Sequence, residues 1–345
     1  MILSAFSLSL LNVRSGKRAD VAFGLQAAMD TKKRLYMEKV YTIDLSKLED
    51  LEKEEIYDLL KEKLHLPDYC GTNLDALYDA LTEMGECDIN ILDVSKSEDK
   101  DSLKYIQKIK QVFEDASEIN PDISLHIISG IYLSKYINLY DFEYKKGRHY
   151  LNASRRSPER LVCTKSSKEF AEMIPDAVSC FVIVDNGMYD EPRLLLSREY
   201  RYPTGQFLLS VPAGLIDAGD AGSQESLGGK ELSPCEKAAV REIKEETGIT
   251  LSDKDEIKTV NPLVFSTPGM TDESNALVSV VIKSDIADQL SQDGAEGSEL
   301  FDGFEILTKE EARKILKQGV DNNGIFYSVY TCIALMYYVS DMWKE

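Results

Sequence analysis

Residues 233–249 read SPCEKAAVREIKEETGI, and this stretch carries its own signals for the beginning and the end of a helix. Ser233 is a good N-cap, Pro234 suits the first helical position, and Glu236 completes an S-x-x-E capping box. Gly248 stands where a left-handed C-terminal cap is expected. The sequence therefore predicts a helix that begins after Ser233 and ends before Gly248.

Three glutamates share one side of this predicted helix. At about 100° per residue, Glu242, Glu245 and Glu246 fall within an arc of roughly 100°. Carboxylates gathered in this way repel one another unless a cation offsets their charge, and oxygen ligands suit a hard ion such as Mg²⁺. The alternative interpretation is a solvated acidic helix face, which such charge runs commonly form.

The neighbours of these glutamates match more than charge alone. Residues 241–249, REIKEETGI, resemble the core of the Nudix box, R-E-U-x-E-E-x-G-U, where U is an aliphatic residue. This nine-residue match favours a metal-binding helix over a solvated acidic face. It also implies the Nudix fold, an α/β/α sandwich around a mixed sheet, for the second part of the chain.

The beginning of the box departs from the family pattern, G-x5-E-x7-R-E-U-x-E-E-x-G-U. Gly214 fits the first position, but six residues later stands Asp220 in place of the usual glutamate. Twenty residues, rather than seven, then separate Asp220 from Arg241. We interpret residues 221–232, rich in Gly, Ser and Glu, as an inserted loop. Either Asp220 fills the role of the first glutamate, or the site functions without it.

Three further stretches indicate one branch of this family. Residues 200–205 (YRYPTG), 210–217 (SVPAGLID) and 267–271 (TPGMT) are similar to landmarks of ADP-ribose and ADP-sugar pyrophosphatases. The resemblance implies hydrolysis of a nucleoside diphosphate linked to a sugar, giving AMP and a sugar phosphate when the substrate is ADP-ribose. It also implies a homodimer formed through the Nudix domain, in which N-terminal strands help to complete the partner's site.

The same resemblance assigns roles to individual residues. The ligands that it implies for Mg²⁺, or alternatively Mn²⁺, are Glu242, Glu245 and Glu246. Arg241 would orient these carboxylates, Glu245 would also act in catalysis, and a loop glutamate, Glu299 with Glu296 as its alternate, would assist the attacking water. The residues expected to bind the substrate are Arg201, Arg155, Gly214, Pro268 and Gly269. A surface ion pair is the alternative role for either of the two substrate arginines.

A second resemblance lies in the first part of the chain. Residues 64–81, LHLPDYCGTNLDALYDAL, are similar to the barstar signature L-x-L-P-x-Y-x-G-x-N-L-D-A-L-x-D-x-L. The surrounding pattern predicts strand, helix, helix, strand, helix and strand, which favours a small parallel sheet with helices packed on it. The expected elements are strand 40–45, helix 51–64, helix 74–81, strand 89–94, helix 103–116 and strand 123–128.

Barstar-like proteins inhibit small basic ribonucleases, because carboxylates can replace substrate phosphates among basic side chains. Carried over by position, Asp79 would be the main phosphate mimic; the other partner-binding residues would be Asp75, Tyr69, Gly71 and Asn73. Residues 37–128 hold about 23 acidic and 10 basic side chains, which suits a basic partner. Two observations oppose tight inhibition: Cys70 stands where the family often has a second aromatic residue, and the aspartates can equally form the solvated face of a helix.

Composition narrows the remaining possibilities. A net charge of −20 and a pI near 4.7 argue against nucleic acid as a direct ligand. The six cysteines form no CxxC pair, which fits a reducing cytoplasm, and three scattered histidines make a zinc site improbable. We find no apolar run long enough for a membrane span. Residues 1–36 read as a flexible leader, or as the product of an overlong start-codon assignment.

The sequence thus predicts an α/β protein of two domains: a barstar-like domain over 37–130 and a Nudix domain over 131–345. Strands at 132–143 and 149–153 are assigned to the second domain. The leading hypothesis is a Mg²⁺-dependent ADP-sugar diphosphatase that carries a ribonuclease-binding module. The alternative is a non-catalytic, nucleotide-sensing ribonuclease inhibitor of the antitoxin or immunity type.

Overall fold

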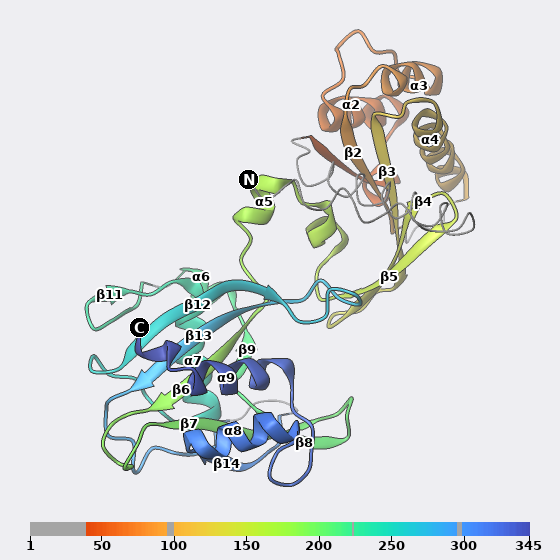
Figure 1. Ribbon diagram of the computed structural model, residues 1–345. Helices are drawn as coiled ribbons and strands as arrows, with labels where there is room; N and C mark the ends of the chain where they lie inside the picture. The colour runs from red at the N-terminus through yellow and green to blue at the C-terminus, as the bar shows by residue number, and fades with distance from the viewer. Residues whose placement is uncertain (1–38, 95–99, 223, 295–298) are drawn as a thin grey trace, which may run out of the picture. The chain divides into compact units, whose positions relative to one another are not determined.

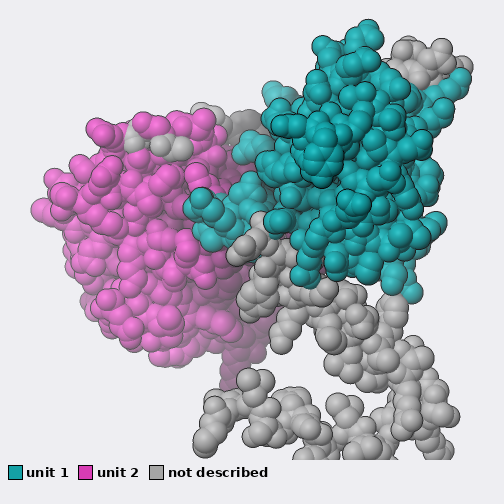
Figure 2. All heavy atoms as spheres, turned by 90° about the horizontal axis from the view of Figure 1, so that it is seen from above, with its two compact units in different colours: residues 1–173 teal, residues 174–345 magenta. Residues whose placement is uncertain are grey.

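The computed structural model describes residues 39–94, 100–222, 224–294 and 299–345 (Figure 1). The chain forms two compact units, Met1–Met173 and Ile174–Glu345, coloured teal and magenta in Figure 2. The leader expected over residues 1–36 lies outside the described residues. In the described part of the chain, no helix combines the length and the apolar character needed to cross a membrane.

The first unit is built on a five-stranded sheet in the order β1-β2-β3-β4-β5. Its strands are β1 (Val40–Asp44), β2 (Cys87–Asp93), β3 (Ile123–Tyr132), β4 (Asn138–Lys145) and β5 (Arg148–Ser154). Strands β1, β2 and β3 run parallel, whereas β4 and β5 form an antiparallel hairpin that pairs with β3. The parallel sheet expected from the sequence is confirmed.

One face of this sheet carries the main core of the first unit. The helical elements are η1 (Leu45–Leu48), α2 (Lys53–Leu64), α3 (Leu74–Thr82) and α4 (Lys100–Ile119). Alternate residues of β2, Cys87, Ile89 and Ile91, point into a core that they share with these helices. Side chains at the intervening positions face the opposite side, because successive residues of a strand alternate between its two faces.

That opposite side is covered in part by the segment that follows β5. This segment contains η2 (Pro158–Arg160), η3 (Val162–Thr164) and α5 (Ser167–Ala171). Leu161 packs there with Leu92, Ile128 and Tyr140 in a second, smaller core.

The position of β4 and β5 differs from the sequence-based expectation. Both strands were assigned to the second domain, yet β4 pairs with β3, with Ile128 opposite Phe142, inside the first unit's sheet. The predicted division near residue 130 therefore falls within this sheet, whereas the compact units divide after Met173. The physical reason is local: only a short connection separates β3 from β4, and sequential strands commonly pair.

The second unit is an α/β/α sandwich around a mixed sheet, as predicted. Five strands follow the order β12-β13-β6-β7-β14, while β8 pairs with β7 and β9 pairs with β6. The strands are β6 (Ala177–Val184), β7 (Arg193–Arg201), β8 (Gln206–Ser210), β9 (Ala213–Leu215), β12 (Glu256–Phe265), β13 (Ser274–Ile282) and β14 (Phe301–Leu307). Among the strand pairs that the structure describes in this unit, β13 and β6 pair in parallel and the others are antiparallel.

Helices cover both faces of this sheet. Val178, Cys180 and Val182 of the fully buried strand β6 face a core shared with α7, whereas Phe181 and Ile183 face a core shared with α8 and α9. The helices of this unit are α6 (Ala218–Gly222), α7 (Pro234–Thr247), α8 (Lys309–Gln318), α9 (Val329–Val339) and the short η4 (Met342–Lys344).

Helix α7 has the boundaries expected from its sequence. The hydroxyl of Ser233 accepts from the N–H of Glu236, the Glu236 carboxylate accepts from the N–H of Ser233, and Pro234 opens the helix. Gly248 ends it in the left-handed region with φ 75°.

The expected insertion at 221–232 contains a small hairpin. It is formed by β10 (Ser226–Leu227) and β11 (Lys230–Glu231), and Leu232 is buried behind it. Two contacts hold the hairpin against the unit: the N–H of Gly228 donates to Asp253 over 2.9 Å, and Lys230 lies 2.7 Å from Glu236. The inserted residues therefore form a hairpin that ends just before α7, and the boundaries of that helix are unaffected.

The two glycine caps of the second unit provide a matched prediction. Gly248 and Gly319 both end helices with φ near +75°, at 75° and 73°. A Cβ at Gly248 would lie 2.2 Å from the carbonyl oxygen of Gln289, whereas a Cβ at Gly319 meets nothing within 4 Å. We expect Gly319→Ala to cost about 1 kcal/mol through backbone strain alone, and Gly248→Ala to cost clearly more in urea unfolding. Equal losses in the two variants would contradict the close packing of residue 289 on the end of α7.

Candidate active site

The glutamates of α7 converge as the sequence predicts. Glu242 and Glu246 are 6% and 4% exposed, and Glu245 is half-buried at the rim. These side chains therefore do not form a solvated acidic face. Two carboxylates have instead been removed from water on one side of a helix, which is unfavourable without compensation.

Arg241 supplies part of that compensation. Its NH1 lies 2.7 Å from Glu242 and 3.1 Å from Glu245, and its NH2 donates to the carbonyl of Leu215 over 2.8 Å. Burial disfavours the charged guanidinium, but hydrogen bonds and charges from Asp220 and Glu242 more than offset this and raise the pKa of Arg241. Arg241 thus bonds to two of the three carboxylates, and its role in orienting them for a metal stays a prediction.

Asp220 is the buried acid that stands in place of the first glutamate of the box. Its carboxylate accepts from NH2 of Arg241 over 3.1 Å and from the backbone N–H of Asp217 over 2.8 Å. It therefore holds the arginine from the side opposite Glu242. The long spacing between Asp220 and Arg241 is compatible with this contact because the hairpin of the insertion brings the chain back.

Gly214 lies where the carboxylate of Glu242 needs space. A Cβ at Gly214 would stand only 1.9 Å from Oε1 of Glu242. The adjacent Ala213 donates its N–H to Glu246 over 3.4 Å, and β9, which holds both residues, pairs with β6. Strand β9 thus presents a notch and a backbone donor to the two buried carboxylates of α7.

Glu199, on β7, is a member of this site that the sequence analysis missed. Its side chain is 10% exposed and forms an ion pair of 2.5 Å with Arg201. Burial raises the pKa of Glu199, and the charge of Glu299 adds to this effect. Alternation along β7 places Glu199 on the same side as Leu195, which faces the α7 core. The available signal was the alternation itself, which places Glu199 at the same kind of position as the apolar Leu195.

Glu299 interacts electrostatically with the buried glutamates of this site. Its charge contributes to raising the pKa of Glu199, Glu242 and Glu246. The backbone supports this placement, because Tyr200 donates its N–H to the carbonyl of Leu300 over 2.8 Å. The alternate candidate, Glu296, lies outside the described residues.

The electrostatics of the cluster call for a further cation. Burial raises the pKa of Glu242 to about 7, against the opposing effect of Arg241 and with a contribution from Glu245. Burial, followed by the charge of Glu199, raises the pKa of Glu246 well above its ordinary value. Oxygen-rich, negatively charged and partly enclosed, the donor set fits a hard divalent ion.

Arg241 occupies part of the carboxylate set. Among the described residues, no group of three Asp, Glu, His or Cys side chains is placed to hold a metal. The reason is visible at NH1 of Arg241, which occupies one oxygen of Glu242 and one of Glu245. The ligand set of Glu242, Glu245 and Glu246 therefore stays a prediction.

The expected substrate residues lie in different places. Arg201 ends β7, half-exposed beside Glu199, and Gly214 lies against Glu242. Pro268 and Gly269 form part of an exposed turn closed by hydrogen bonds to the carbonyl of Thr267. Arg155 belongs to the first unit, directly after β5. Substrate contact by each of them stays a prediction.

The expected partner-binding residues of the first unit lie at the start of α3. Asp75 and Asp79 are exposed on this helix, and Tyr69 is 89% exposed in the loop before it. Asn73 is the N-cap, whose side-chain oxygen accepts from the N–H of Ala76 over 2.8 Å. Gly71 has little space for a side chain, because its Cβ would lie 3.1 Å from Cβ of Ala76.

Residues 173–327, which include helix α7 and strand β9, match the family model of the NUDIX domain. Residues 38–127 match the model of Barstar (barnase inhibitor). Each of the two family models thus matches its own segment of the chain, which confirms both resemblances found in the sequence.

Several named proteins are similar to part of this chain. Putative nudix hydrolase 2 of Caenorhabditis elegans is 33% identical over 119 residues, which cover 34% of this chain and 45% of that protein. The ADP-sugar pyrophosphatase of Mus musculus is 33% identical over 112 residues, 32% of this chain and 43% of that protein. The ADP-ribose pyrophosphatase of Saccharomyces cerevisiae is 35% identical over 97 residues, 28% of this chain and 34% of that protein. The chain thus spans less than half the length of each of these relatives.

The raised pKa of Glu242 predicts how stability changes with pH in protein freed of divalent ions. With a pKa of about 7 in the folded state, against about 4.3 in the unfolded chain, this group keeps its proton longer in the fold. Its contribution to stability is full below pH 4.3 and falls by up to about 3 kcal/mol as the pH rises to 7. We expect Glu242→Gln to gain on the wild type by that order between pH 5 and 8, in urea unfolding with EDTA. A constant difference would contradict the assignment.

Proposed function

We propose that the second unit hydrolyses the diphosphate bond of an ADP-sugar such as ADP-ribose, giving AMP and a sugar phosphate. The observation that carries this proposal is the burial of Glu242 and Glu246 beside Arg241, because it gathers carboxylates whose charge a bound divalent cation would balance. The names of the mouse and yeast relatives, an ADP-sugar and an ADP-ribose pyrophosphatase, support the choice of substrate.

The cofactor that best fits this donor set is Mg²⁺, with Mn²⁺ as the alternative. When bound, such an ion neutralises phosphate charge and lowers the pKa of a coordinated water. Glu242, Glu245 and Glu246 would hold it. Glu245 would leave Arg241 to do so, and as the half-exposed member of the three it has the freedom to turn. Arg241 would then keep Glu242 in place through Asp220 on its other side.

The remaining residues act on the substrate and on the proton. Arg201 would exchange its ion pair with Glu199 for the phosphates, a step that its half-exposed guanidinium permits. Glu299, on the exposed segment before β14, would accept the proton of the attacking water. Arg155, Pro268 and Gly269 would contact other parts of the substrate. A homodimer formed through the Nudix domain belongs to the same proposal.

A second function is favoured by the surface of α3. We propose that the first unit binds a small basic ribonuclease through Asp79 and Asp75, with Tyr69, Gly71 and Asn73 shaping the approach. The exposure of both aspartates and of Tyr69 supports this role, because none of the three is committed to packing within its unit. A non-catalytic, nucleotide-sensing inhibitor remains the alternative for the whole chain, and the two assays below separate it from the enzyme.

Hydrolysis is tested with ADP-ribose and Mg²⁺. We expect the wild type to release AMP and Glu246→Gln to lose at least about 100-fold in turnover, because loss of a direct ligand should exceed the usual effect of an outer-shell change. Glu310→Gln, an exposed glutamate at the start of α8, is the matched control and should retain activity. Nucleotide binding by a wild type that hydrolyses no nucleoside diphosphate sugar would favour the non-catalytic alternative.

Partner binding is tested with barnase as the basic ribonuclease. We expect Asp79→Ala to weaken association by at least about 10-fold, and the affinity of the wild type to fall as salt screens the charges. Asp58→Ala, an exposed aspartate on α2, removes the same charge elsewhere in the unit and should have little effect. Equal binding by Asp79→Ala and the wild type would exclude this face of α3 as the contact.

A further inference from the structure

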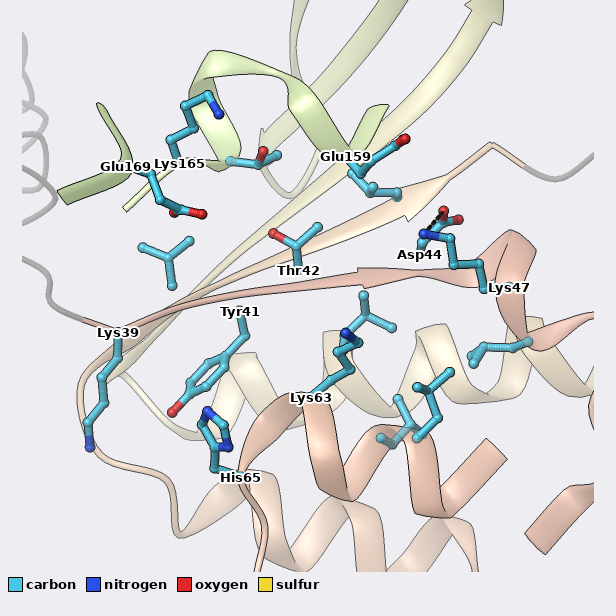
Figure 3. Close-up of a pocket in the computed structure, with 17 residues that line it drawn as sticks. Lys39, Tyr41, Thr42, Asp44, Lys47, Lys63, His65, Glu159, Lys165 and Glu169 are labelled. Carbon is cyan, nitrogen blue, oxygen red and sulfur yellow. Dashed lines mark ion pairs between the residues drawn. The ribbon is translucent and has the colours of Figure 1, made fainter. Parts of the chain in front are cut away.

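A groove of about 680 Å³ follows the outer edge of β1 in the first unit (Figure 3). All five residues of β1 line it, so it runs along the strand and not against one face of the sheet. Strand β1 pairs with β2 on one side, and in the part of the chain that the structure describes no strand pairs with its other edge. The backbone N–H and C=O groups that point outward along such an edge are available to an added strand.

The groove has a wall on each side of β1. On the side of the helices, Tyr41 and Ile43 line it together with Leu59, Lys63 and His65 of α2 and its end. His65 adopts the left-handed conformation, φ 53°, and its ring meets Tyr41 edge-on at 5.9 Å. Because neighbouring residues of an extended chain point to opposite sides, a strand laid along β1 would place alternate side chains against this wall.

The second wall is formed by the segment after β5. Thr42 of β1 faces this side, and Thr164, Lys165 and Glu169 line it across the groove. The segment is held in its own conformation, since Ser166 and Glu169 form a reciprocal capping box at the start of α5. Both walls thus contain a helix, α2 on one side and α5 on the other.

Lysines surround the groove in a unit that is otherwise strongly acidic. Lys39 and Lys47 lie at the two ends of β1, Lys63 lies on the helical wall and Lys165 on the other. Lys47 pairs with Asp44 at 3.7 Å, whereas Lys39, Lys63 and Lys165 form no ion pair with any residue that the structure describes. The same lining carries the carboxylates of Asp44, Glu159 and Glu169, so its four lysines leave a small positive balance, which favours an anionic occupant.

We propose that this groove binds an extended acidic peptide of a partner protein, which adds as a strand to the edge of β1. Main-chain hydrogen bonds would supply affinity, and acidic side chains at alternate positions would reach Lys63 on one wall and Lys165 on the other. Lysines at a sheet edge also oppose pairing with apolar or basic strands. The chain's own residues 1–37 hold six Lys and Arg against two Asp, and so have the wrong charge for this groove.

The experiment measures binding of a fluorescein-labelled peptide of alternating Glu and Val by polarisation to the full chain. We expect binding to the wild type, and at least about 10-fold weaker binding to the double variant Lys63→Glu, Lys165→Glu. The double variant Lys53→Glu, Lys108→Glu changes two exposed lysines of α2 and α4 that do not line the groove; it is the charge-matched control and should bind within about twofold of the wild type. Absence of binding to the wild type, or an equal loss in the control, overturns the proposal.

Two further arms separate strand addition from simple attraction between charges. The same peptide with proline at its central valine keeps its charge but cannot complete the main-chain pairing, so it should bind at least 10-fold more weakly. Equal binding of the proline peptide would show anion binding without strand addition and overturn the proposal. A chain that lacks residues 1–37 should bind as the wild type does; binding gained only on this deletion would mean that the chain's own N-terminal segment fills the groove.

Discussion

The burial of two carboxylates against one guanidinium, on one side of α7, is the constraint around which the second unit is built. Glu242 and Glu246 have lost most of their contact with water, and Arg241 bonds to only one of them. Charges of the same sign held in this way destabilise the fold unless each neighbouring element is shaped to receive them. Strand β9 contributes a residue without a side chain at Gly214 and a backbone donor at Ala213.

Support for the same cluster extends along the helix in both directions. Asp220 accepts a hydrogen bond from NH2 of Arg241, and this contact holds the guanidinium beside Glu242. At the other end, Gly248 allows residue 289 to pass within a distance that any side chain would prevent. The insertion, by contrast, contacts the unit through Gly228, Lys230 and the core residue Leu232, all of which precede α7. This division explains how the box tolerates a long interruption: the added residues lie where the chain enters the helix, not where the carboxylates point.

The limits of sequence reasoning follow from the range of each interaction. Helix α7 could be predicted with its boundaries because caps and a 3.6-residue period are local, and the α3 cap at Asn73 follows the same rule. Glu199 could not be found in this way. Its charge acts on Glu246 because the sheet places β7 on the side of the core that α7 covers, and that placement is not local in the sequence. The sequence analysis placed β4 and β5 in the second domain. In the structure, the sheet of the first unit continues beyond residues 38–127 and includes both strands. Alternation shows that a segment is a strand but does not specify its neighbour.

The choice between enzyme and sensor is an argument about stability. A domain that only recognised a nucleotide could do so with hydrogen-bond donors and apolar contacts, and would have no use for acids held at a raised pKa. Replacing Glu242 or Glu246 by a neutral residue of similar shape would remove an unfavourable burial and leave the caps, the glycine notch and both cores intact. Unfavourable burial of charged groups is retained mainly at functional sites. A site that binds a cation is such a case, because its carboxylates destabilise the fold when no cation is bound. The carboxylates of α7 therefore weigh more heavily for catalysis than the substitution of Asp220 weighs against it.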